Sequence, residues 1–157
     1  MFNEGSIDGV KIVELKKFTD SRGWLMELFR DDEVDDALFP AMGYISMTQS
    51  GIARGPHEHV AQTDYFCFTG PSSFKVFLWD NRPESPTYKN RMTLVAGEDN
   101  PIAVIIPPGI VHAYKNIGDK DGMVLNYPNK LYMGPNKAEE VDEVRYEDNE
   151  NSEFKVD

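Results

Sequence analysis

Two stretches of the chain decide its fold: GIARGPHEHVAQTDYFCFTG over residues 51–70 and PPGIVHAYKN over residues 107–116. They contain all 3 histidines of the 157-residue chain. In a β-strand, residues two apart project to one face, so a strand through His57 and His59 places both imidazoles on the same side. In the second stretch, the Pro-Pro-Gly sequence predicts a tight turn before a strand that begins near His112.

The rest of the chain repeats a pattern of short apolar runs separated by turn residues. The runs are rich in β-branched and aromatic side chains, and glycine, proline, asparagine and aspartate cluster between them. This pattern predicts an all-β sandwich or barrel. The length suits one core, so we expect a single domain over residues 1–157. The acidic segment 139–157 is expected to be a solvated edge or tail, although its apolar residues alternate as in a strand.

Composition restricts the partners of the protein. The formal net charge is −11, and such a chain repels nucleic acid and anionic lipid at long range. An anionic ligand therefore needs locally placed cations. The single cysteine, Cys67, excludes an intrachain disulfide and suits a reducing compartment. No apolar window approaches a membrane span, and the N-terminus has no secretory signal pattern. We expect a cytoplasmic protein.

The histidines predict a metal site as one possibility. Three neutral imidazoles and the Asp64 carboxylate on neighbouring strands can surround one divalent transition-metal ion and leave open positions for a substrate. In the simpler alternative, the histidines bond to their neighbours or face solvent. The two stretches resemble the paired motifs of the cupin superfamily, in which H-x-H and a following acid face the histidine of a P-x-G-x-x-H-x-x-x-N block. This resemblance implies a double-stranded β-helix, or jelly roll, that gathers His57, His59, Asp64 and His112.

A second resemblance covers most of the chain up to Tyr132. The order and spacing of several blocks are similar to those of the nucleotide-sugar 3,5-epimerase family, whose best-known member acts on dTDP-4-dehydro-6-deoxyglucose. The blocks are DSRGWLME (20–27), Ser46, GIARGPH (51–57), DNRPESPT (80–87), IIPPGIVHAY (105–114) and Tyr132. This resemblance implies an isomerase that uses no cofactor, binds a nucleotide-diphosphate sugar and inverts carbon centres beside its 4-keto group. It also implies a homodimer in which the N-terminal strands pair across subunits.

The resemblance to the epimerases assigns roles to individual residues. His57 is the general base that removes the proton beside the sugar ketone, and Asp148 is the carboxylate that orients it. Arg22 and Arg54 hold the pyrophosphate, because forked guanidinium donors match phosphate oxygens. The full predicted set of substrate-binding residues is Arg22, Glu27, Arg54, His59, His112, Asn126 and Tyr132.

Three departures from the epimerase pattern keep other functions open. Asp64 stands where the family has a lysine that stabilises the enolate, Asn126 replaces the proton-donating tyrosine, and His59 replaces a glutamine. An enolate beside Asp64 loses a cation and gains a repulsion. The alternatives are a metal-dependent cupin, acting as a dioxygenase or a metal-assisted isomerase, and a non-catalytic sugar-binding module. The order of the blocks favours the epimerase, since the Arg22 block and residues 80–87 have no role in a generic metal cupin.

Overall fold

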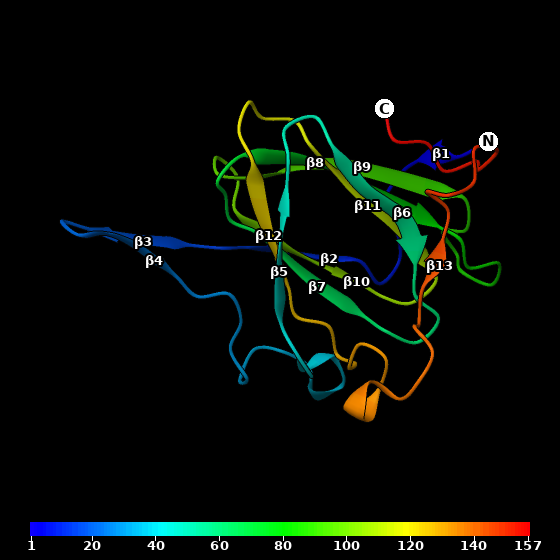
Figure 1. Cartoon of the computed structure of the whole chain (residues 1–157), viewed down its shortest axis with the longest axis horizontal. Helices are drawn as coiled ribbons and strands as arrows, with labels where there is room; N and C mark the ends of the chain where they lie inside the picture. Colours follow the sequence, from blue (N-terminus) through cyan, green and yellow to red (C-terminus); the bar gives the residue numbers. More distant parts are fainter.

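The computed structural model describes residues 1–157, and its regular secondary structure is almost entirely β-strand (Figure 1). The elements are β1 (Asn3–Glu4), β2 (Lys11–Glu14), β3 (Lys17–Asp20), β4 (Gly23–Met26), η1 (Asp36–Leu38), β5 (Tyr44–Thr48), β6 (Ala53–Glu58), β7 (Asp64–Phe68), β8 (Ser73–Asp80), β9 (Asn90–Gly97), β10 (Ile102–Ile106), β11 (Ile110–Asn116), β12 (Gly122–Asn126), η2 (Pro135–Lys137) and β13 (Val144–Arg145), where η1 and η2 are short 3₁₀ helices. No helix is long and apolar enough to cross a membrane.

All strands except β3 and β4, which form a two-stranded sheet of their own, belong to two sheets that face each other. One sheet has the order β1-β9-β8-β11-β6-β13 and the other has the order β2-β10-β7-β12-β5. Many neighbouring strands, such as β8 and β11 or β7 and β10, are far apart in the sequence and pair antiparallel. This long-range pairing is typical of a jelly roll, in which two sheets enclose one core. The prediction of an all-β cupin barrel is confirmed.

The alternation of side chains in β7 shows how the core is divided. Phe66 and Phe68 point between the two sheets and join the main core, whereas Tyr65 and Cys67 pack on the outer face of the same strand. All of β7 is buried because both of its faces are covered, which explains why the four residues after Asp64 are apolar or aromatic. Cys67 is a buried free thiol, and burial raises its pKa to about 12.

Two segments flank the body of the sandwich. The hairpin of β3 and β4 projects away from the two sheets at one side (Figure 1). The C-terminal segment returns along the opposite side, where β13 pairs with β6 and Phe154 packs edge-on against Trp79. Phe154 is only 5% exposed. The expectation of a solvated tail is therefore wrong for Phe154, whereas Val141, Val144 and most of the acidic side chains of this segment do face solvent.

Candidate functional site

A cavity of about 1130 Å³ opens between β5, β6 and the C-terminal segment. Its volume lies slightly above the range of about 300 to 1000 Å³ that is usual for small-molecule sites. Positively and negatively charged side chains line the cavity. The cationic ones are Arg54, Lys130, Lys137 and Arg145, and the acidic ones are Glu139, Glu140, Asp142, Glu143 and Glu147.

The structure brings the three histidines together at this cavity. β6 and β11 pair antiparallel with His57 directly opposite His112, and the two ring centroids lie 4.5 Å apart. His59 follows β6 immediately, with its ring 5.8 Å from that of His57 and 5.7 Å from that of His112. His57 and His59 line the cavity. His112 is only 2% exposed and lies behind them.

A glycine permits this close approach of the two strands. Gly55 has a φ of +81°, and a Cβ atom at this position would lie 2.6 Å from the carbonyl oxygen of His112. Only a residue without a side chain fits such a contact at a positive φ. The glycine that precedes the Pro-His sequence is therefore needed to hold His57 against β11.

Asp64 lies at the base of the histidine cluster. Its Oδ2 atom is 3.1 Å from Nε2 of His59 and 3.2 Å from Nε2 of His112. Its Oδ1 atom accepts hydrogen bonds from the side-chain amides of Gln62 and Asn126, both at 2.8 Å. Burial alone would raise the pKa of Asp64, but the two imidazoles hold it well below its usual range. Burial opposes protonation of His59 as well, yet the carboxylate raises the pKa of His59 to about 9.

His57 faces two carboxylates of the C-terminal segment. Its Nδ1 atom lies 3.5 Å from Oε1 of Glu143 and 3.9 Å from Oε1 of Glu147. Burial, and then the neighbouring imidazoles of His112 and His59, lower the pKa of His57 to about 2. His57 is therefore an uncharged imidazole at neutral pH, in the form that can accept a proton.

The structure does not bring Asp148 to His57. Asp148 is exposed and lies outside the lining of the cavity, and the carboxylates that approach His57 come from Glu143 and Glu147 instead. Sequence reasoning missed both glutamates. The alternation of Val144 and Tyr146 could have found them, because it places residues 143, 145 and 147 together on the other face of the segment.

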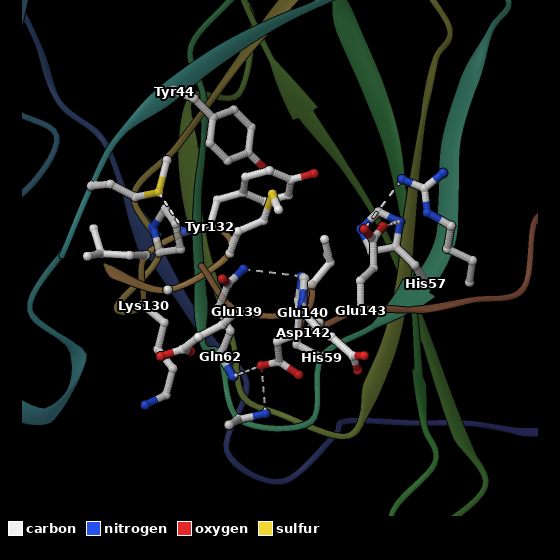
Figure 2. Close-up of a pocket in the computed structure, with 18 of the residues that line it drawn as sticks. Tyr44, His57, His59, Gln62, Lys130, Tyr132, Glu139, Glu140, Asp142 and Glu143 are labelled. Atoms are coloured by element: carbon white, nitrogen blue, oxygen red, sulfur yellow. Dashed lines mark hydrogen bonds and ion pairs between the residues drawn. The ribbon is translucent and has the colours of Figure 1, made fainter. Parts of the chain in front are cut away.

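Asp142 fixes the turn that carries His59. The backbone carbonyl of Asp142 contacts Nδ1 of His59, and its carboxylate accepts the backbone N–H groups of Val60 (2.7 Å), Ala61 (2.9 Å) and Gln62 (2.8 Å). His59, Gln62 and Asp142 lie together at the lower wall of the cavity in Figure 2. The C-terminal segment thus holds the second histidine in place through both its backbone and a side chain.

Tyr44 lies across the cavity from His57 (Figure 2). Asn126 is directly opposite Tyr44 in the pairing of β12 with β5, and its amide donates a 3.0 Å hydrogen bond to the Tyr44 hydroxyl. Burial raises the pKa of Tyr44 to about 12, so the phenol keeps its proton at neutral pH. Asn126 itself is fully buried and does not line the cavity. Sequence reasoning missed Tyr44, because no local pattern links it to Asn126.

The predicted substrate-binding residues fall into three groups: those that line the cavity, those that are buried behind it (His112 and Asn126), and those that lie elsewhere in the chain. Arg54 and Tyr132 line the cavity with His59. The Arg54 guanidinium donates to the Thr48 hydroxyl at 2.9 Å and to the Met47 carbonyl at 2.7 Å.

Arg22 and Glu27 lie elsewhere within the single chain. Arg22 is at the tip of the β3–β4 hairpin, where its side chain is 88% exposed and pairs with Asp20. Glu27 borders a second cavity of about 370 Å³ and lies 3.5 Å from Arg30. Neither residue lines the cavity that contains His57.

Comparison with known proteins gives concordant results. A family model described as dTDP-4-dehydrorhamnose 3,5-epimerase matches residues 4–151. The probable low-salt glycan biosynthesis epimerase Agl13 of Haloferax volcanii is 38% identical over 129 residues, which cover 81% of each chain. The spore coat polysaccharide biosynthesis protein SpsL of Bacillus subtilis is 35% identical over 137 residues, which cover 85% of this chain and 87% of that protein.

Solved structures share the fold at lower identity. A dTDP sugar isomerase from Desulfovibrio desulfuricans has a TM-score of 0.77 at 22% identity, and the match covers 88% of this chain and 84% of that one. The family match spans nearly the whole chain and the relatives match along most of their own length. The chain therefore belongs to the dTDP-4-dehydrorhamnose 3,5-epimerase family, a family of nucleotide-sugar epimerases.

Proposed function

We propose that the protein epimerises a nucleotide-diphosphate-linked 4-keto-6-deoxy sugar by removing and returning a proton on the carbon beside the ketone. The observation that carries this proposal is the placement of an uncharged imidazole, His57, on one wall of the cavity and a phenol, Tyr44, on the other (Figure 2). Inversion needs a base on one face of the carbon and an acid on the opposite face. Family membership and the names of the relatives support this class of substrate.

His57 acts as the general base. Glu143 lies behind it and is the carboxylate that stabilises the imidazolium formed when His57 takes the proton. Glu143 takes the role that the sequence assigned to Asp148. Tyr44 returns a proton from the other side, in place of the tyrosine that Asn126 replaces, and the amide of Asn126 holds the Tyr44 hydroxyl in position.

Cations at the rim hold the diphosphate. Arg54 exposes its guanidinium at the cavity, and Lys130 and Arg145 lie on the same lining. Charge-assisted bonds to phosphate are stronger than neutral ones, and they offset the repulsion between an anionic ligand and a chain of net charge −11. The reaction moves protons without net oxidation or reduction, so it needs no electron carrier.

The exposed hairpin supports a homodimer. Several large apolar side chains of the hairpin and of the adjacent sheet face solvent in the single chain: Ile12, Val13, Phe18, Trp24, Leu25, Ile45 and Met47. β2 and β5 are edge strands of this sheet, and unpaired edges favour association. In the dimer, the hairpin reaches the second copy, and Arg22 and Glu27 contact the nucleotide bound there.

Light scattering at micromolar concentration should show a dimer, which Trp24→Asp should weaken; a monomeric native protein would contradict this arrangement.

The central test is solvent exchange with His57→Asn. Native protein should incorporate deuterium from D₂O into dTDP-4-keto-6-deoxyglucose, and His57→Asn should lower that rate at least about 100-fold, because general-base catalysis supplies about 10² to 10⁴ in rate. Binding of dTDP, measured by thermal shift, should survive in the variant. Native protein that binds dTDP yet exchanges no proton would instead identify a non-catalytic binding module.

A further inference from the structure

We propose that Asp64 is a positioning residue for inversion, because it orients the amide of Asn126 and so directs the O–H group of Tyr44 toward the substrate. This inference rests on the proposed function, in which Tyr44 is the second acid. Asp64 acts through Asn126 and needs no contact with the reacting sugar. The three residues lie on neighbouring strands of one sheet, since β5 carries Tyr44, β12 carries Asn126 and β7 begins at Asp64.

The orientation of the Asn126 carboxamide follows from its buried partners. Its Oδ1 atom accepts a 3.0 Å hydrogen bond from the backbone N–H of Tyr65, a group that can only donate. The Nδ2 atom faces the other way, where it donates to Oδ1 of Asp64 at 2.8 Å and to the Tyr44 hydroxyl at 3.0 Å. Asn126 is fully buried. A reversed carboxamide would place a donor against the Tyr65 N–H and an acceptor against the Asp64 carboxylate, without water to compensate.

The Asp64 carboxylate is held in place by groups on both sides. Its Oδ2 atom lies 3.1 Å from Nε2 of His59 and 3.2 Å from Nε2 of His112, so the other oxygen, Oδ1, faces Asn126. Gln62 donates a second hydrogen bond to the same Oδ1 atom at 2.8 Å. Asp64 is only 1% exposed. These neighbours fix the carboxylate, which in turn fixes the amide that it accepts from.

The direction of the Tyr44 hydroxyl follows from that of the Asn126 amide. An amide nitrogen donates and does not accept, so the phenol oxygen is the acceptor and its own hydrogen takes no part in this contact. Asn126 is the only hydrogen-bond partner of this hydroxyl in the chain. Tyr44 lines the cavity, whereas Asn126 is buried behind it. The phenolic hydrogen therefore lies on the cavity side, which faces His57 (Figure 2).

This network joins two of the departures from the epimerase pattern. Asp64 stands in place of a lysine and Asn126 in place of a tyrosine, and the two side chains are hydrogen-bonded to each other. A lysine at position 64 would present a donor to the Asn126 amide, which itself donates there. An asparagine at position 126 that donates to Tyr44 thus requires an acceptor at position 64.

Two substitutions of Asp64 separate positioning from charge. Asp64→Asn keeps an oxygen acceptor for Asn126 and removes the charge, whereas Asp64→Ala removes both. The readout is the ratio of net inversion to deuterium entry from D₂O into dTDP-4-keto-6-deoxyglucose, because His57 can exchange a proton on its own face without Tyr44. Asp64→Ala should lower this ratio at least about 10-fold, since misplacement of a reacting group by about 1 Å can cost about 100-fold in rate. Asp64→Asn should retain the native ratio.

Asn129→Ala is the control for the loss of hydrogen bonds near Asp64. Asn129 bonds to the backbone of Thr63 and Ala37 outside the lining of the cavity, so its substitution should not change the ratio. An equal fall in Asp64→Asn and Asp64→Ala would assign the effect to charge and overturn the inference. A low ratio in Tyr44→Phe with a native ratio in Asp64→Ala would contradict this inference alone. Inversion that survives in Tyr44→Phe would contradict the proposed function as well.

A measurement on the unmodified protein covers the case in which a buried variant does not fold. Both Nδ2 hydrogens of Asn126 should exchange with D₂O at least about 100-fold more slowly than those of the exposed Asn149, because both are buried and hydrogen-bonded. Nuclear Overhauser effects should connect one of these hydrogens to the ring hydrogens of Tyr44. Nδ2 hydrogens that exchange as fast as those of Asn149, or that lie against the backbone N–H of Tyr65, would overturn the inference.

Discussion

The Nδ1 atom of His57 and the Oε1 atom of Glu143 lie 3.5 Å apart, with both side chains largely shielded from solvent. This contact joins β6 to the C-terminal segment at the point where a proton would be taken from a substrate. It also makes Glu143, rather than Asp148, the carboxylate beside His57, although the sequence alone had favoured Asp148 for this position.

Replacement of Glu143 should slow proton abstraction more than replacement of Asp148. Glu143→Gln removes the charge that stabilises an imidazolium at His57, so we expect kcat for exchange to fall about 10- to 100-fold with little change in KM. Asp148→Asn is the matched control and should leave the rate nearly unchanged, because its side chain is exposed and outside the cavity. The reverse order of effects would return the orienting role to Asp148.

Tyr44→Phe should separate exchange from inversion. Without the phenol, His57 still removes and returns a proton on its own face, so deuterium should continue to enter the substrate. Net inversion needs the opposite face and should fall at least about 100-fold. Nuclear magnetic resonance in D₂O measures both rates on one sample, with Tyr88→Phe, at an exposed position outside the cavity, as the control. Equal loss of both rates would exclude Tyr44 as the second acid.

Arg54→Ala should weaken the binding of dTDP by about 1.5 to 3 kcal/mol, since a charge-assisted bond to phosphate is lost at an exposed position. Arg22→Ala should have an effect of similar size only if the hairpin contacts the nucleotide of a second copy. Arg91→Ala, which breaks a surface pair with Asp157, is the control. Calorimetric titration with dTDP measures the affinity of each of the three variants. Native-like affinity in Arg22→Ala would restrict the binding site to one chain.

Acid stability should depend on Asp80, which is fully buried. Burial alone would raise its pKa, but Arg82, Ser85 and Thr87 hydrogen-bond to the carboxylate and hold the pKa well below the usual range. A carboxyl with a depressed folded-state pKa stabilises the protein above its unfolded pKa of about 3.9, and this contribution is lost as the pH falls through the folded value.

Asp80→Asn should therefore lower the free energy of unfolding at pH 7 by about 2 to 3 kcal/mol and flatten its dependence on pH below about 4. Urea denaturation at pH 7 and at pH 3 measures both effects. Asp119→Asn, in an exposed loop, should change neither value. A stability difference between native protein and Asp80→Asn that is the same at both pH values would contradict the assignment.

The barrel and the histidine cluster could be predicted because both depend on local alternation. His57 and His59 are two residues apart, and the turn before His112 is formed by the consecutive residues 107–109, Pro-Pro-Gly. The positions that could not be predicted depend on pairing between distant strands. Tyr44 meets Asn126 only through the register of β5 with β12, and Glu143 meets His57 only because β13 pairs with β6.

The position of Arg22 shows a second limit of prediction from sequence. Its block matches the epimerase pattern, yet tertiary structure places it on a hairpin that leaves the body of its own chain. A sequence motif does not specify which copy of a chain supplies a residue to a site. The acidic segment was mispredicted for a different reason. Its composition suggested a solvated tail, but a single apolar residue, Phe154, anchors it to the core.

The attachment of the C-terminal segment through Asp142 has a consequence for heat inactivation. Its carbonyl and carboxylate hold His59 and the turn behind it, whereas β13 adds only two residues to the sheet. Residues 139–145, which precede the Phe154 anchor, include no buried residue, and such stretches open at lower free energy than the body of a domain. As the temperature rises, the wall that carries Glu143 should detach while the two sheets remain intact. Turnover would then be lost several degrees below the melting temperature, and bound ligand should close that gap.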